Sequence, residues 1–162
     1  MTCGIGIALI FLLMNGPLLQ AALDLQATVV TGETAIDFGN VRSLDPRGEP
    51  FSDTSVRQVR LTIASDLKRP YVISQMAQDL PVNTNGTAIE PEALRFRVVV
   101  ENGSGIVRTS DLEPLRPGMQ EIYLSSDNEE QTVLLITYNL TPSPGQKAGR
   151  YQGTISYRVD AR

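Results

Sequence analysis

The chain has 162 residues, a length that suits one domain and allows a hydrophobic core without disulfides. Its 14 Lys and Arg against 18 Asp and Glu give a formal charge of −4, and the arginines stand singly among carboxylates, which argues against a nucleic-acid-binding surface. The sequence has no His and no Trp, and its only cysteine is Cys3, so His-based nucleophile activation and His metal sites are excluded.

Residues 1–21 carry no charged side chain and form a segment of their own. The apolar run 5–14 is shorter than the ~20 residues of a membrane-spanning helix and has the length of a signal-peptide core. No Lys or Arg precedes the run, and the small residues expected before a cleavage point are incomplete. We predict a signal peptide in residues 1–21 and a mature chain from about Ala22, the alternatives being an uncleaved N-terminal anchor or a buried helix.

A mature chain that begins near Ala22 lacks Cys3 and therefore cannot form a disulfide. The predicted location is the periplasm, the cell surface or the extracellular space, where the fold would depend on packing alone. Contact with the membrane is expected only through the signal peptide during export.

After the N-terminal segment, apolar and polar residues alternate in short runs, which is the pattern of strands with one buried face. Segments rich in Gly, Pro, Asn and Asp separate these runs, and no stretch has a sustained helical period. In chain order, the predicted strands are residues 23–29, 35–39, 56–64, 71–74, 94–100, 106–108, 119–124, 134–140 and 151–159.

The closing strand shows the alternation most clearly. Tyr151, Ile155, Tyr157 and Val159 share one face, and polar residues share the other, as in an antiparallel sheet with one solvated side. Gly153 interrupts the apolar row, and we predict a bulge or a close backbone approach there.

Two Asn-Gly pairs mark expected turns. Asn102-Gly103 lies between the runs 94–100 and 106–108, which predicts a two-residue hairpin with positive φ at both central residues. Asn85-Gly86 lies in the long loop 79–92, where we expect a turn.

The alternating strands and the turns between them together predict an all-β fold, an antiparallel Ig-like β-sandwich of about eight or nine short strands, with residues 22–162 as a single domain.

Carboxylates are the remaining candidates for chemistry. The close pairs are Glu90 with Glu92, Asp111 with Glu113, and Glu129 with Glu130. All lie in turn-rich loops, so we interpret them as solvated loop charges rather than a glycosidase pair. The segment 127–130 offers oxygen ligands to calcium but lacks the spacing and glycine of a known calcium loop. We predict no catalytic residue, no metal and no cofactor.

The five tyrosines could form a sugar-binding platform or part of the core. Tyr138, Tyr151 and Tyr157 stand in the apolar phase of their strands, which favours the core. Three segments fit the N-glycosylation pattern, and they begin at Asn85, Asn102 and Asn139.

Three phrases together resemble bacterial secreted β-sandwich subunits of the spore-coat-U and chaperone–usher pilin type. They are the apolar strand 23–29, the segment Ala-Ile-Asp-Phe-Gly-Asn-Val at 35–41, and Ala-Gly-Arg-Tyr-Gln-Gly-Thr-Ile at 148–155. The phrases follow the order expected of such subunits over most of the mature chain. Such pilins often carry a disulfide, which this mature chain cannot form.

The resemblance implies a non-catalytic structural subunit that joins its neighbour by strand donation, in which main-chain hydrogen bonds give affinity and alternate side chains give register. The implied partners are other protein subunits and a periplasmic chaperone. The candidate donor strand is carried by Leu23, Leu25, Ala27 and Val29. The same residues could instead form an ordinary first strand of a self-contained sandwich that binds a glycan or a protein ligand, and the sequence leaves both readings open.

Overall fold

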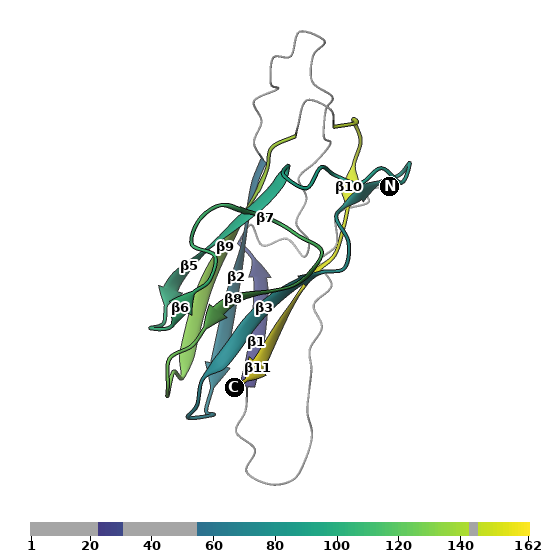
Figure 1. The fold of residues 1–162 in the computed structure, drawn as a ribbon. Helices are drawn as coiled ribbons and strands as arrows, with labels where there is room; N and C mark the ends of the chain where they lie inside the picture. Colours follow the sequence, from purple (N-terminus) through teal and green to yellow (C-terminus); the bar gives the residue numbers. More distant parts are fainter. Residues whose placement is uncertain (1–22, 31–54, 143–145) are drawn as a thin grey trace.

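A computed structural model describes residues 23–30, 55–142 and 146–162, and Figure 1 shows their course. These residues form strands and no helix. The predicted strand 35–39 and the predicted signal peptide 1–21 lie outside the described residues. The strands are β1 (Leu23–Val29), β2 (Ser55–Ser65), β3 (Tyr71–Ala77), β4 (Val82–Asn83), β5 (Leu94–Asn102), β6 (Ile106–Val107), β7 (Glu113–Pro114), β8 (Gly118–Leu124), β9 (Gln131–Leu140), β10 (Tyr151–Gln152) and β11 (Ile155–Ala161).

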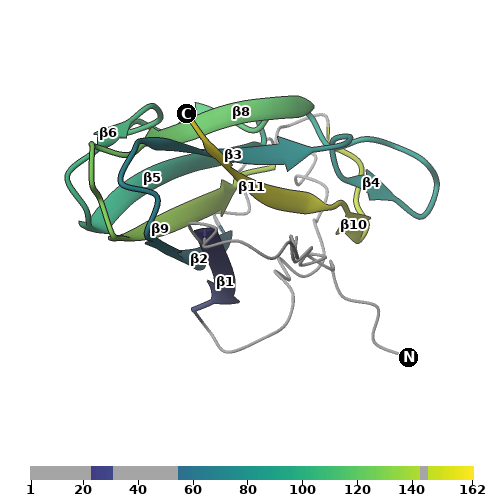
Figure 2. The same ribbon diagram turned by 90° about the horizontal axis from the view of Figure 1, so that it is seen from below.

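The strands form two main sheets that pack face to face (Figure 2). A five-stranded sheet has the order β1-β2-β9-β5-β7, and a four-stranded sheet has the order β11-β3-β8-β6. The short strands β4 and β10 pair with each other beyond one end of the sandwich (Figure 1). All pairings are antiparallel. The predicted all-β antiparallel sandwich is therefore confirmed.

The order of the long strands differs from that of an immunoglobulin constant domain. Among the described residues, seven strands have seven or more residues. Numbered one to seven in chain order, these long strands lie in the order 1-2-6-4 in one sheet and 7-3-5 in the other. An immunoglobulin constant domain places the fifth strand where this chain places the sixth. The two folds therefore share an architecture of two packed sheets and differ in connectivity.

The core lies between the sheets and follows the predicted alternation. On β2, Val59, Leu61 and Ile63 are buried, and Arg60 on the opposite face is exposed. On β9, Leu134, Ile136 and Tyr138 are buried on the same side. The other sheet contributes its own inward-facing residues, among them Tyr71, Ile73, Ile122 and Tyr123.

On the outer face of the five-stranded sheet, an ion pair spans the central strand. The Arg60 Nε and one Nη donate to the two carboxylate oxygens of Glu101 at 2.7 and 3.0 Å. Arg60 belongs to β2 and Glu101 to β5, while β9 runs between them with Leu135 beside Arg60 in the register. The exposed pair thus bridges two strands that do not hydrogen-bond to each other.

The predicted hairpin at Asn102-Gly103 is wrong. The strand β5 pairs with β9 and β7, whereas β6 pairs with β8 in the other sheet, so this turn carries the chain from one sheet to the other. Gly103 has a φ of +136°, and Asn102 does not take a positive φ. An Asn-Gly pair predicts a sharp turn but not which sheet the next strand enters.

The predicted closing strand is divided into β10 and β11 at Gly153. A Cβ at this glycine would lie 2.9 Å from the Pro81 Cγ and 3.2 Å from its Cα. The predicted close approach is confirmed, and the neighbouring segment is the one that leads into β4. The strands β4 and β7, each of two residues, lie inside segments that the sequence indicates as loops.

Candidate interaction edge

The predicted donor strand forms β1, at one edge of the five-stranded sheet. It pairs antiparallel with β2 of the same chain, from Leu23 opposite Ser65 to Val29 opposite Val59. Val29 is buried, at 9% exposure, and Leu23, Leu25 and Ala27 are partly buried against the core. The four candidate residues therefore share the inward face, as their spacing predicts, and are seated in their own sandwich.

The backbone of these four residues faces away from β2. The Val30 N–H donates to the Gln58 carbonyl at 2.9 Å, so Val30 stands in a hydrogen-bonded pair. In an antiparallel ladder such pairs alternate, so Thr28 and the other even-numbered residues of β1 also bond to β2. The N–H and C=O groups of Leu23, Leu25, Ala27 and Val29 consequently point outward from the sheet edge.

The strand β11 forms the corresponding edge of the four-stranded sheet. The Arg162 N–H donates to the Pro70 carbonyl at 2.8 Å, which directs the backbone groups of Ile155, Tyr157 and Val159 away from β3 by the same alternation. The side chains of these three residues are partly buried against the core. Both edges therefore combine outward backbone groups with inward apolar side chains.

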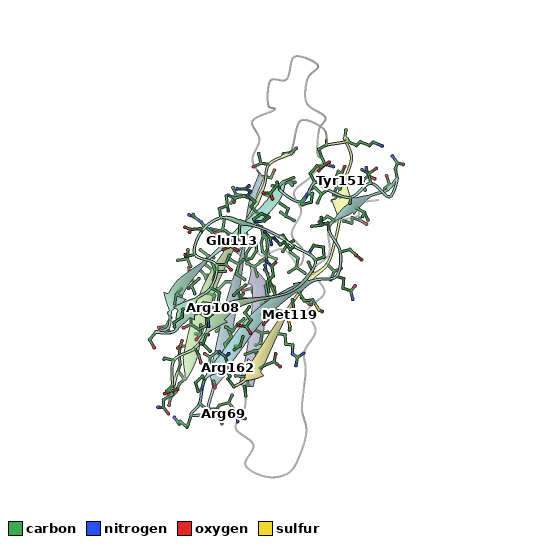
Figure 3. The ribbon with its side chains drawn as sticks, in the orientation of Figure 1. Arg69, Arg108, Glu113, Met119, Tyr151 and Arg162 are labelled. Carbon is green, nitrogen blue, oxygen red and sulfur yellow. The ribbon has the colours of Figure 1, made fainter. Side chains whose placement is uncertain are left out.

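The two edges lie on the same side of the sandwich. The strands β1 and β11 contact each other and run in opposite directions (Figure 1). Figure 3 places Arg162 and Arg69 at one end of this arrangement and Tyr151 at the other. One side of the molecule thus presents one strand edge from each sheet.

The opposite side of the sandwich is covered in part by the chain itself. The segment that follows β5 crosses from the four-stranded sheet back to the five-stranded sheet and bonds to both. The Arg108 N–H donates to the Ile122 carbonyl at 3.0 Å, and the Thr109 carbonyl accepts from the Val98 N–H at 2.9 Å. Pro114 in the edge strand β7 has no N–H to donate. Among the described residues, β1 and β11 are the long strands that lie at the edges of the two main sheets.

Natural sheet edges are often protected by lysine, proline or a bulge. β1 contains none of these: it has no Lys or Pro, and its register with β2 is continuous. Its one charged side chain is Asp24, which is exposed on the outer face. Among the described residues, no strand pairs with the outer edge of β1, and none of these protective features lies on it.

The carboxylate with the most contacts, Glu129, is held by hydrogen bonds from its own fold. One oxygen accepts from the hydroxyls of Tyr123 and Thr132 at 2.6 and 2.5 Å, and the other accepts from the Ser126 N–H and hydroxyl at 2.9 and 3.0 Å. Burial raises the pKa of Glu129, but these hydrogen bonds outweigh it and leave the pKa below its ordinary value. Burial and the contact with Glu129 raise the pKa of Tyr123 to about 12.

This arrangement suits a structural carboxylate rather than a general acid, which needs a raised pKa. Its neighbour Glu130 is exposed and bonds to Lys68 at 2.5 Å. Among the described residues, no group of three or more acidic side chains is placed to hold a metal ion.

The tyrosines lie in the core rather than on a surface platform. Four of the five tyrosines are buried, and the fifth, Tyr157, packs against the core. The alternation of apolar residues predicts this position for Tyr138, Tyr151 and Tyr157. The Tyr138 hydroxyl bonds to the Gln75 side chain and to the Tyr157 hydroxyl, each at 2.8 Å.

The phrase around Tyr151 has a structural role. Its hydroxyl donates to the Lys147 carbonyl at 2.8 Å and accepts from the Gln146 side-chain amide. This bond to a carbonyl four residues upstream resembles the tyrosine corner of immunoglobulin-type sandwiches. Gly149, with a φ of +149°, provides the backbone conformation that precedes it.

Comparisons with known proteins assign no family. No protein-family model matches the chain, and no curated protein matches it. Among solved structures, the chain is similar to a family 123 glycoside hydrolase from Clostridium perfringens, studied for glycolipid glycan hydrolysis, with 15% identity and a TM-score of 0.43. The match covers 85% of this chain and 25% of the hydrolase. A likeness at this level carries no argument about activity. The described segments contain no apolar helix of membrane-spanning length.

Proposed function

We propose that the chain is a non-catalytic secreted subunit of a bacterial surface or pilus-like assembly, and that it joins a neighbouring protein subunit by strand addition at β1. The observation that carries this proposal is the outer edge of β1, which no other described strand pairs with and which lies on the same side as β11, opposite a side that the chain covers in part. An added strand would bond to the outward backbone groups of Leu23, Leu25, Ala27 and Val29.

A binding role rather than catalysis is supported by the absence of His and by the use of Glu129 within the fold. The periplasm, the cell surface or the extracellular space is the proposed location, and a periplasmic chaperone is a proposed transient partner that would cover the same edge before assembly.

One observation favours a second candidate, a self-contained module that binds a glycan or a protein ligand. β1 is already paired with β2 along its length, so the described sandwich does not need a strand from another molecule. The two candidates differ in whether the outer edge of β1 is used.

Two matched proline variants separate the candidates, with mass measured by light scattering on a sizing column. The Ala27 N–H points outward, so Ala27→Pro blocks an added strand and removes no bond to β2. Thr28→Pro instead removes a bond to β2 and should lower the melting temperature.

The proposal predicts multimers of the wild type and a folded monomer for Ala27→Pro with little change in melting temperature. A wild type that is monomeric at all concentrations would instead support the self-contained module. Multimers that persist in Ala27→Pro would place the subunit contact away from β1.

A further inference from the structure

The two Asn-Gly pairs lie at different turns, and the fold treats them differently. Asn85 and Gly86 are exposed in the loop between β4 and β5, and Asn102 and Gly103 are exposed at the turn between β5 and β6. When glycine follows asparagine, the backbone nitrogen of the glycine can attack the side-chain carbonyl of the asparagine. The approach is easy because glycine has no Cβ to hinder it. Whether the reaction occurs depends on how freely that nitrogen can move.

At the first turn the attacking nitrogen is engaged. The Gly86 N–H donates to the Asn83 carbonyl at 2.9 Å. The buried Asn83 side-chain oxygen also accepts from the N–H groups of Asn85 and Thr87 at 3.0 and 2.9 Å, and the Asn83 N–H donates to the Thr87 carbonyl at 2.9 Å. Four hydrogen bonds thus hold this turn, and one of them must break before Gly86 can react.

At the second turn the attacking nitrogen makes no hydrogen bond of its own to a described residue. Within the described part of the chain, the Gly103 N–H makes no hydrogen bond. The next two residues do bond: the Ser104 hydroxyl to the Ser126 hydroxyl, and the Gly105 N–H to the Tyr123 hydroxyl. Asn102 is the last residue of β5, where the register with β9 is already irregular. The nitrogen of Gly103 is therefore not held by a hydrogen bond of its own, unlike the nitrogen of Gly86.

We propose that Asn102 is a site of spontaneous deamidation in the folded protein and that Asn85 is protected by its turn. The Gly103 nitrogen forms a bond to the Asn102 Cγ and loses its proton to solvent, and the side-chain nitrogen leaves as ammonia. Water then opens the resulting cyclic imide at either carbonyl, which gives aspartate or isoaspartate. The net change is one amide and one water converted to one carboxylate and one ammonium ion.

The modification alters a turn that has little room. A Cβ at Gly103 would lie 2.5 Å from a Glu129 carboxylate oxygen and 2.7 Å from the Tyr123 hydroxyl, so the backbone of Gly103 packs directly on the bond between these two residues. Isoaspartate adds a methylene to the main chain beside Gly103, and either product adds a negative charge next to Glu101. The reaction should therefore weaken the contact between Tyr123 and Glu129.

The test is to incubate the purified protein at neutral to mildly alkaline pH and to follow both sites by peptide mass mapping. The expected result is roughly tenfold faster deamidation at Asn102 than at Asn85, the factor given by one hydrogen bond that must break. The same chain in denaturant is the matched control, and there the two rates should become similar. Asn83→Ala, which removes the acceptor for Asn85 and Thr87, should increase the rate at Asn85 alone.

Similar rates in the folded protein, a faster reaction at Asn85, or no reaction at Asn102 while the denatured chain reacts would each overturn the proposal. The deamidated fraction should also melt at a lower temperature than the unmodified protein, and Asn102→Gln should abolish that difference.

Discussion

Glu129 is a loop carboxylate that the fold holds by hydrogen bonds. It accepts four hydrogen bonds from Tyr123, Thr132 and Ser126, and it links the turn after β8 to the start of β9. Tyr123 in turn accepts from the Gly105 N–H at 2.7 Å, so the turn before β6 is tied to the same carboxylate. Glu129, which looks like a solvated loop charge in the sequence, thus links three chain segments through hydrogen bonds: the turn before β6, the end of β8 with the turn after it, and the start of β9.

The lowered pKa of Glu129 predicts a pH dependence of stability. Because the folded pKa lies below the unfolded value, the ionised carboxylate stabilises the fold above the unfolded pKa, and this contribution is lost as the pH falls through the folded pKa. Glu129→Gln should destabilise the protein by about 1–3 kcal/mol at pH 7. It should also flatten the loss of stability between neutral and acidic pH, measured by urea unfolding.

Glu121→Gln is the matched control, since Glu121 is exposed on the outer face of β8. It should leave the acid dependence of the wild type intact. An acid dependence that is equally steep in Glu129→Gln would show that Glu129 does not carry this effect.

Tyr151 offers a second test at this scale. Tyr151→Phe keeps the buried ring and removes the hydroxyl that bonds to Lys147 and Gln146, which should cost about 1–2 kcal/mol in the free energy of unfolding. A double-mutant cycle with Gln146→Ala should show coupling between the two sites. Additive effects would contradict the view that the two side chains act as one unit.

At the scale of elements, the sequence predicts what depends on local alternation. The faces of β2, β9 and β11 follow directly from period two, since each strand has one side on the core. The pairing partners do not follow, because pairing is a long-range property. The turn after β5 has the residues of a hairpin and yet leads into the other sheet, and its conformation depends on contacts of Gly103 with Glu129 and Tyr123 that lie far away in the sequence.

The candidate edge was predictable only in part. The alternation of β1 identifies Leu23, Leu25, Ala27 and Val29 as one face, but it contains no signal that β1 lies at a sheet edge or that β11 lies beside it. Two-residue strands such as β4 and β7 carry too few positions for any periodicity. The Asp-Asn-Glu-Glu segment shows only charge, whereas its hydrogen bonds depend on tyrosine and threonine side chains of other strands.

Removal of β1 tests its role as an element. Without residues 22–30, the inward faces of Val59, Leu61 and Ile63 lose a neighbouring strand, and we expect destabilisation of at least about 3 kcal/mol, comparable with a large core truncation. A synthetic peptide of residues 22–30 added in trans should restore the melting temperature. A peptide with Leu25→Asp and Val29→Asp is the control and should not, because its inward face is charged. A truncated chain as stable as the whole would show that β1 contributes little to this sandwich.

At the scale of the whole molecule, the sandwich has two unlike sides. One side is covered in part by the crossing segment after β5, and the other presents the edges of β1 and β11. Because the two long edges lie on the same side, pairing with a neighbour is favoured on that side of the sandwich. The proposed assembly uses the β1 edge on this side.

Residue-resolved amide hydrogen exchange at low and high protein concentration shows whether the outer edge of β1 pairs with another strand. The amides of Gln26 and Thr28 bond to β2 and should be protected at both concentrations. The amides of Leu25, Ala27 and Val29 point outward and should exchange fast in the monomer and become protected only when subunits assemble. Outward amides that stay fast in a sample shown to be multimeric, or that are already protected in the monomer, would contradict strand addition at β1.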